Sequence, residues 1–162
     1  MKRKPVIAIL GTGQELEASI SDARSLGRLI ADCGWVLITG GRSSGVMKAA
    51  NEGARAANGL TIGILPDGRT EISTSVDVAI ITDTGEARNN IIVLSANVVV
   101  ACGIDDPGTA SEVALALKAG KPVILVGAPG ESDWSFFRKI GGEGIQTAAS
   151  PEEAVRLINN LI

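Results

Sequence analysis

The stretch NVVVACGIDDPGTASEVALALKAGKPVILV, residues 97–126, predicts a strand, a helix and a second strand in succession. Asn97–Cys102 and Pro122–Val126 are nearly continuous apolar runs, typical of parallel strands buried on both faces. The helix between them is expected over Thr109–Ala119, ending at Gly120. Two parallel strands need such a crossover connection, so this stretch indicates an α/β sheet.

The same alternation extends toward both ends of the chain. Further strands are expected at Val6–Leu10, Trp35–Thr39, Leu60–Leu65 and Val78–Ile81, and their apolar character also suits burial on both faces. Helices are expected along the Ile20–Cys33 apolar stripe and over about Gly45–Ala57, and a last one opens with Ser150-Pro151-Glu152-Glu153. We therefore expect a single α/β domain over residues 1–162. It should be a doubly wound, mostly parallel, Rossmann-like sheet with helices on both faces and a ligand site at the carboxyl ends of its strands.

Composition excludes several classes of function. The chain has no His, which removes the commonest general base and transition-metal ligand, and we expect no metal site. Cys33 and Cys102 fit no metal or redox spacing and are expected to be reduced thiols in the core. A net charge of −3, with two Trp, two Phe and no Tyr, argues against nucleic-acid binding.

No apolar run approaches the roughly 18 residues that a membrane-spanning helix needs. The run Val6–Leu10 is also shorter than a signal-peptide core of about 7–15 residues. We therefore expect a cytoplasmic protein without a membrane partner.

The first candidate loop is GTGQELE, residues 11–17. A dinucleotide fingerprint would need Gly where Leu16 stands, and the second strand ends in Gly40-Gly41 rather than near an acidic residue. No NAD or FAD is expected, and the Gly-Lys-Ser/Thr of a P-loop is missing as well. Gly11 and Thr12 are candidate ligand contacts, and a plain tight turn is the alternative.

The second loop, TGGRSSG at residues 39–45, predicts an anion site. Glycines let a backbone approach a ligand, and the first turn of a helix has free amides. Hydroxyl groups and a guanidinium add donors. The candidate residues are Gly40, Gly41, Arg42, Ser43, Ser44 and Gly45. A glycine turn with a Ser N-cap is the alternative.

The third loop, GEARNN at residues 85–90, places Arg88 in the first turn of a helix whose apolar side is expected to be Ile91, Ile92 and Leu94. A cation there opposes the helix dipole, which favours a functional reason for it. The alternative is a solvated surface arginine.

In the fourth loop Thr109 and Glu112 have the spacing of a capping box, with Thr109 as the N-cap. A structural role for Glu112 is therefore as well supported as a catalytic one. Asp105 and Asp106 precede this helix and either cap it or contact a ligand.

Four motifs in order resemble LONELY GUY-type proteins, once misnamed lysine decarboxylases: GGRSSGVMKAANEGA, GLTIGILP, EARNNIIVLSANVVVACG and GTASEVALALKAGKPVILV. The length and the GEARN segment look most like the molybdenum cofactor carrier branch of that superfamily. The resemblance covers nearly the whole chain.

The hydrolase branch of this superfamily cleaves the N-glycosidic bond of cytokinin nucleoside monophosphates. Arg88, Gly108, Thr109 and Glu112 match its motif, and the resemblance implies that Arg88 and Glu112 would be catalytic in such an enzyme. Asn89 replaces the lysine that follows the arginine, and residues 103–107 replace a double glycine with a segment that contains two carboxylates. These departures argue against phosphate binding at that loop.

The resemblance to the carrier branch implies a protein that binds molybdenum cofactor, a pterin with a dithiolene-held molybdenum and a terminal phosphate. Its phosphate would lie at Arg42, with Arg88 and Asn89 nearby and Thr109 and Glu112 at the border. We expect Asp105 and Asp106 to accept hydrogen bonds from the pterin. The resemblance also implies a homo-oligomer, a dimer or a tetramer, and a carrier implies proteins that donate and accept the cofactor. A phosphoribohydrolase and a nucleotide-sensing module are the alternatives.

Overall fold

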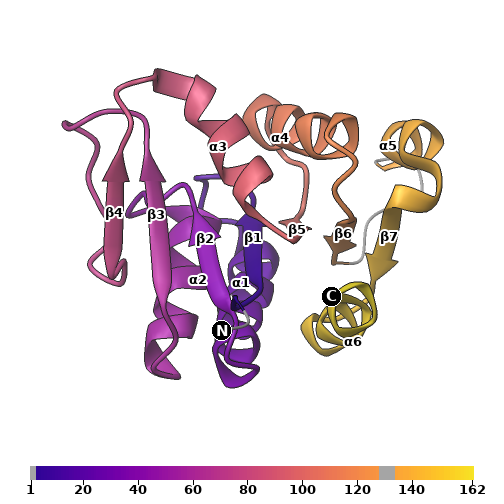
Figure 1. Ribbon diagram of the computed structural model, residues 1–162, viewed down its shortest axis with the longest axis horizontal. Helices are drawn as coiled ribbons and strands as arrows, with labels where there is room; N and C mark the ends of the chain where they lie inside the picture. Colours follow the sequence, from indigo (N-terminus) through magenta and orange to yellow (C-terminus); the bar gives the residue numbers. More distant parts are fainter. Residues whose placement is uncertain (1–2, 128–133) are drawn as a thin grey trace.

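A single parallel sheet runs through the computed structural model, which describes residues 3–127 and 134–162. Its strands lie in the order β4-β3-β2-β1-β5-β6-β7, from left to right in Figure 1. They are β1 Val6–Leu10, β2 Val36–Thr39, β3 Thr61–Leu65, β4 Val78–Ile81, β5 Val98–Cys102, β6 Val123–Val126 and β7 Ile145–Ala148. Every neighbouring pair is parallel. The predicted α/β, doubly wound, Rossmann-like fold is confirmed.

The strand order reverses between β1 and β5. The chain builds β2, β3 and β4 outward on one side of β1, then returns to start β5 on its other side. Ile7 pairs with Val98 and Leu10 with Ala101, so β1 and β5 end at the same edge. Loops that leave adjacent strands in opposite directions create a crevice, and ligands bind there in open α/β sheets.

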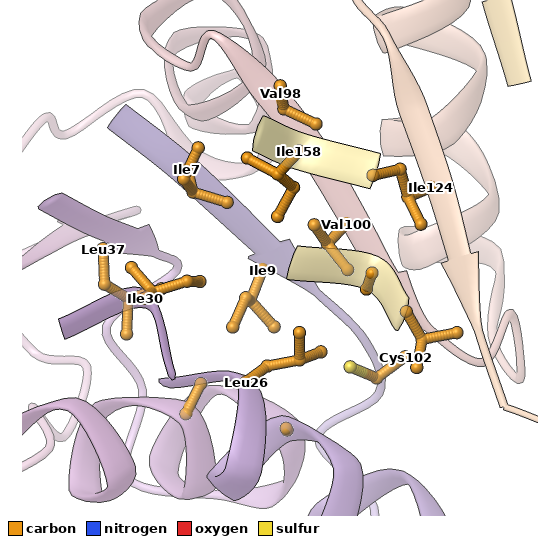
Figure 2. Close-up of a cluster of buried hydrophobic side chains, with 14 of the residues drawn as sticks. Ile7, Ile9, Leu26, Ile30, Leu37, Val98, Val100, Cys102, Ile124 and Ile158 are labelled. Atoms are coloured by element: carbon orange, nitrogen blue, oxygen red, sulfur yellow. The ribbon is translucent and has the colours of Figure 1, made fainter. Parts of the chain in front are cut away.

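Side chains alternate along the central strands and fill two separate cores. Ile7 and Ile9 of β1 pack on one face with α1 (Glu17–Asp32), α2 (Gly45–Ala56) and α6 (Pro151–Leu161). Figure 2 shows this core, where Leu26, Ile30 and Ile158 meet the strand residues. Ala8 and Leu10 pack on the other face with α3 (Arg88–Ser95) and α4 (Pro107–Lys118). The expected helices on both faces are confirmed.

The carboxyl-terminal part of the sheet contains elements that the apolar runs did not predict. They are α5 (Ser135–Gly141), a 3₁₀ turn η2 (Gly142–Gly144) and β7. β7 has one buried residue, Ala148, and its sequence Ile-Gln-Thr-Ala lacks a continuous apolar run. Edge strands need less apolar surface than central ones, so this strand gave a weak sequence signal.

β4 contradicts the expectation that all the early strands are buried on both faces. All four of its residues are exposed, with Ile81 at 55%. The reason is topological, because β4 is the sheet edge and a loop over residues 66–77, rather than a helix, connects it to β3.

Two smaller expectations are also wrong. Cys33 is exposed at the end of α1, whereas Cys102 is buried as expected. On α3 the buried apolar residues are Ile92 and Val93, while Ile91 and Leu94 face outward with 40% and 52% exposure. Among the helices of residues 3–127 and 134–162, none is long and apolar enough to cross a membrane.

Candidate functional site

A pocket opens where β1 and β2 end, at the reversal of strand order. Water can enter a volume of about 110 Å³. The lining comes from the ends of β1 and β2, the first turn of α2, the 3₁₀ turn η1 (Gly85–Ala87) and the first turns of α3 and α4. It consists of Ile9, Leu10, Gly11, Gly13, Gly40, Arg42, Met47, Glu86, Arg88, Asn89, Asp106, Gly108, Thr109 and Glu112. Three of the four candidate loops therefore contribute polar side chains to one pocket.

Arg88 is a buried cation, which excludes the alternative of a solvated surface arginine. The residue is 5% exposed, and Nη1 donates a hydrogen bond of 3.2 Å to the carbonyl oxygen of Ile64 in β3. Burial lowers the pKa of Arg88, while the carboxylates of Glu112 and Glu86 act in the opposite direction. An arginine stays protonated because its ordinary pKa is so high. The pocket therefore holds a fixed positive charge shielded from water.

Glu112 lies in the same pocket with 9% of its surface exposed. Burial is the main reason why the pKa of this carboxyl is raised from 4.5 to about 7. The positive charge of Arg88 opposes the rise, and the negative charges of Asp106 and Glu86 add to it. Near neutral pH the group is therefore partly protonated and can either donate or accept a hydrogen bond. The expected capping-box contact of Glu112 is not formed, because the helix begins earlier than Thr109.

Arg42 reaches the pocket mouth from the loop after β2. Its Nη2 lies 3.2 Å from Oε1 of Glu86, and the other Glu86 oxygen lies 4.0 Å from Nη2 of Arg88. One carboxylate thus lies between two guanidinium groups that come from different loops. The Glu86 side chain is 69% exposed, whereas that of Arg88 is 6% exposed.

Gly40 is required by the close approach of Arg88. A Cβ atom at Gly40 would lie 2.2 Å from Nη1 of Arg88 and 2.7 Å from Sδ of Met47. Beneath this loop the Thr39 hydroxyl accepts a hydrogen bond of 3.0 Å from the amide of Gly41 and donates one of 3.2 Å to Asn51 of α2. This buried network fixes the path of the chain as it leaves β2.

Three amides of the second loop already have partners within the protein. Gly41 donates to Thr39, Ser43 donates to the carbonyl oxygen of Glu71, and Gly45 donates to the Glu15 carboxylate at 3.2 Å. The negative charge at the start of α2 is therefore Glu15, from the first loop. This leaves Gly40 and Arg42 as the part of the loop that borders the pocket.

Thr12 and Gly45 join the first two loops. Thr12 is 1% exposed, and its carbonyl oxygen accepts a hydrogen bond of 3.0 Å from the amide of Val46. Gly45 has φ +52°, and a Cβ atom there would lie 2.3 Å from that same oxygen. Gly45, one of the three glycines that predicted an anion site, is thus required by this contact between the loops.

Asp106, and not Thr109, is the N-cap of α4. Its Oδ1 accepts a hydrogen bond of 2.8 Å from the amide of Thr109, and its Oδ2 lies 3.3 Å from the Thr109 hydroxyl. Pro107 then occupies the first helical position, where its missing N–H costs nothing. Asp105 is exposed and folds back over Gly103, outside the pocket lining. The two carboxylates therefore have different environments.

Several buried polar atoms at the pocket lack a hydrogen-bond partner. Within the described residues these atoms include Nε of Arg42, Nε of Arg88 and Oδ1 of Asn89, all on residues that line the pocket. Unsatisfied buried groups are costly, and they often mark a place where a ligand or water completes the bonding. The described part of the chain contains no cluster of three His, Cys, Asp or Glu residues that could hold a metal ion.

Comparison with known proteins places this chain in a family. The model of the SLOG cluster4 family matches residues 4–155. The chain belongs to the SLOG cluster4 family. A protein from Archaeoglobus fulgidus, named only as uncharacterized, is 39% identical over 149 residues, which cover 92% of this chain and 91% of the relative.

Two solved structures resemble this SLOG cluster4 protein over almost their whole length. The molybdenum cofactor binding protein from the phototrophic bacterium Rippkaea orientalis is 49% identical with a TM-score of 0.94, covering 99% of this chain and 98% of its own. The molybdenum cofactor carrier protein from Chlamydomonas reinhardtii is 47% identical with a TM-score of 0.92, covering 98% of each chain. The resemblance to the LONELY GUY-type superfamily and to its carrier branch is thus confirmed.

The structure brings together some of the candidate residues in this SLOG cluster4 protein and leaves others apart. The pocket lining includes Gly11, Gly40, Arg42, Arg88, Asn89, Asp106, Gly108, Thr109 and Glu112, but not Thr12, Gly41, Ser43, Ser44, Gly45 or Asp105. Sequence reasoning missed Ile9, Leu10, Gly13, Met47 and Glu86 as lining residues. Glu86 had a signal, because an acidic residue two positions before a candidate arginine is a possible counter-ion.

Proposed function

We propose that this protein binds molybdenum cofactor as cargo, with an anionic group of the cofactor in the pocket between Arg42 and Arg88. The observation that carries the proposal is a buried, permanently charged Arg88 beside a second guanidinium, each with an unpartnered Nε atom. Arg88 is shielded from water and Arg42 is 40% exposed at the pocket mouth, and two such guanidinium groups together favour an anionic ligand. The carrier and binding proteins at 47–49% identity support the cofactor as that ligand.

The donor set of the pocket suits the chemistry of this cargo. The bound group supplies a phosphate, a dithiolene-held molybdenum with oxo ligands, and a pterin with N–H donors. Arg42 and Arg88 donate to oxyanions, while Asn89, Asp106 and Glu112 offer acceptors for N–H groups. The dithiolene holds the metal, so the absence of His from the sequence is no obstacle.

The size of the pocket limits how much of the cargo it encloses. A volume of about 110 Å³ is smaller than the roughly 300–1,000 Å³ of ordinary ligand sites. We infer that the phosphate enters the pocket and that the pterin lies across its mouth near Asp106. Asp105 is exposed outside the lining, so it contributes less to orientation than Asp106 does.

Purification of the protein from cells that make the cofactor tests the ligand directly. After oxidation, the protein fraction should contain a fluorescent pterin at close to one molecule per site. Protein that is free of pterin, and that also takes none up from a molybdoenzyme that releases its cofactor, would contradict the proposal.

One observation favours a second candidate function. The pKa of Glu112 is raised to about 7, and its charge interacts with that of Arg88. A phosphoribohydrolase would need such an acid–base group next to a cation that binds oxyanions.

Incubation with adenosine and isopentenyladenosine monophosphates, followed by chromatography of the free base, separates the two functions. We expect little or no release, because Asn89 replaces the lysine of the hydrolase motif. Turnover of about 1 per second or more would establish an enzyme, and nucleotide binding without turnover would indicate a sensing module.

The proposed cargo role implies partners. A carrier receives its cofactor from one protein and delivers it to another, and we propose such a donor and acceptor here. We also propose a homo-oligomer, since α3 carries exposed apolar residues on its outer side.

A further inference from the structure

Glu86 places its carboxylate between the two guanidinium groups that border the pocket. One oxygen lies 3.2 Å from Nη2 of Arg42 and the other lies 4.0 Å from Nη2 of Arg88. The three residues come from different segments: the loop after β2, the turn η1 and the start of α3. The carboxylate therefore lies where an anionic ligand group would contact both arginines.

The three side chains are held to different degrees. Arg88 is buried, bonded to the carbonyl oxygen of Ile64 and packed against Gly40. Glu86 is 69% exposed and belongs to a 3₁₀ turn that buries none of its residues. Ion pairs of exposed carboxylates contribute little to stability, so little free energy is lost when Glu86 rotates into water. Arg88 stays in place while Glu86 can leave.

The charges around the pocket explain why Glu86 would have to leave. Arg42 and Arg88 are positive, while Glu86, Asp106 and the ionised form of Glu112 are negative. The pocket therefore has no surplus positive charge as long as Glu86 remains between the arginines. An incoming anion that contacts the Nη2 atoms of both guanidinium groups has to take the position of this carboxylate.

We propose that Glu86 is a resident counter-ion that competes with the ligand for Arg42 and Arg88 and so makes the pocket select doubly charged anions. This inference rests on the proposed function, because it takes the pocket to be the anion site. A phosphate monoester brings about two charges and three oxygens, more than the carboxylate it replaces. A singly charged anion only replaces the single charge of the Glu86 carboxylate, so its displacement of Glu86 gains little binding free energy.

Phenyl phosphate and phenyl sulfate test the selection, because they have similar shapes but different charges at a pH of about 8. Their affinities are measured by titration calorimetry on the wild type, Glu86→Gln and Asp32→Asn. The last variant is the matched control, because Asp32 is also an exposed acid in an ion pair, with Arg28, but does not line the pocket. We expect the wild type to prefer phenyl phosphate. Glu86→Gln should bind it about three- to tenfold more tightly, and Asp32→Asn should match the wild type.

Glu86→Asp separates competition from simple repulsion. It keeps the negative charge, but its shorter side chain cannot contact both guanidinium groups, so we expect tighter binding than in the wild type. Wild-type affinity in Glu86→Asp, equal affinity of the wild type for both probes, or no gain in Glu86→Gln would each overturn the role of Glu86. A wild type that binds neither probe would overturn the anion pocket itself, and with it the proposed function.

Discussion

Glu112 carries a proton in the pH range where most carboxyl groups in proteins are ionised. Its pKa is raised from 4.5 to about 7, first by burial and then by the charges of Asp106 and Glu86. In the unfolded chain the group returns to its ordinary pKa, so the folded state binds this proton more tightly. The resulting contribution to stability is complete below a pH of about 4.5 and is lost as the pH rises through about 7.

Glu112→Gln should therefore remove a pH-dependent part of the free energy of unfolding. As the pH rises from about 5 to about 8, the free energy of unfolding of the wild type should fall by up to about 3 kcal/mol relative to that of the variant. Urea unfolding at the two pH values measures this difference. Glu143→Gln, at an exposed position on η2, is the control and should follow the wild type. Parallel pH profiles of the Glu112→Gln variant and the wild type would show that the carboxyl titrates normally.

Residue types alone indicated the charged groups of the site but not how they are used. Arg42, Arg88 and Glu112 were found because each lies near an expected helix start after a strand. The contact of Glu86 with Arg42 spans 44 residues, and that of Glu15 with Gly45 spans 30 residues. Such contacts depend on how the loops pack, which no local sequence pattern encodes.

At the scale of elements, the start of α4 shows how a local pattern can mislead. Thr109 and Glu112 have capping-box spacing, yet Asp106 caps the helix and Pro107 follows it. The same arrangement, a capping side chain followed by proline, was correctly predicted for Ser150 at the start of α6. A proline at the first helical position is the stronger signal, because its fixed φ suits only the first turn.

Asp106→Ala should cost about 1 kcal/mol of unfolding free energy through loss of the N-cap. Asp105→Ala is the matched control, since Asp105 is exposed and makes no capping bond, and this variant should stay within about 0.5 kcal/mol of the wild type. Urea unfolding of both variants provides the comparison. Equal losses, or a larger loss for Asp105→Ala, would contradict the assignment of the cap.

The elements themselves were predictable where strands are central and buried. β1, β5 and β6 are continuous apolar runs because helices cover both of their faces, and the sequence placed their boundaries to within one residue. The sequence could not show that β4 would be uncovered, since its composition matches that of a buried strand. β7 and α5 were missed because edge elements need little apolar periodicity.

For the whole molecule, α3 predicts association with a second copy. Its inner side buries Ile92 and Val93, while Ile91 and Leu94 on the outer side are 40% and 52% exposed. The second half of α3 thus has apolar residues on its outer side as well, and an exposed apolar surface of this kind is typical of a protein–protein contact. The first turn of this helix contains Arg88, so an interface here would adjoin the pocket.

Leu94→Glu should convert a homo-oligomer into smaller species, because a charge would then be buried at the interface. Sedimentation velocity measures the change in mass. Phe136→Glu, at a residue of α5 that is 62% exposed, is the control and should leave the assembly intact. A wild-type monomer, or an unchanged oligomer in Leu94→Glu, would rule out this surface.

The central claim is that the pocket between Arg42 and Arg88 holds the molybdenum cofactor. Its most direct test is the uptake of cofactor released from a molybdoenzyme, measured as oxidised fluorescent pterin per chain over a range of cofactor concentrations. Wild-type protein and Arg28→Ala, an exposed arginine on α1, should saturate alike. Arg42→Ala should bind more weakly by roughly 1.5–3 kcal/mol, about 10- to 150-fold, if it donates a charged hydrogen bond. Equal uptake by Arg42→Ala and the wild type, or no uptake by the wild type, would contradict the account.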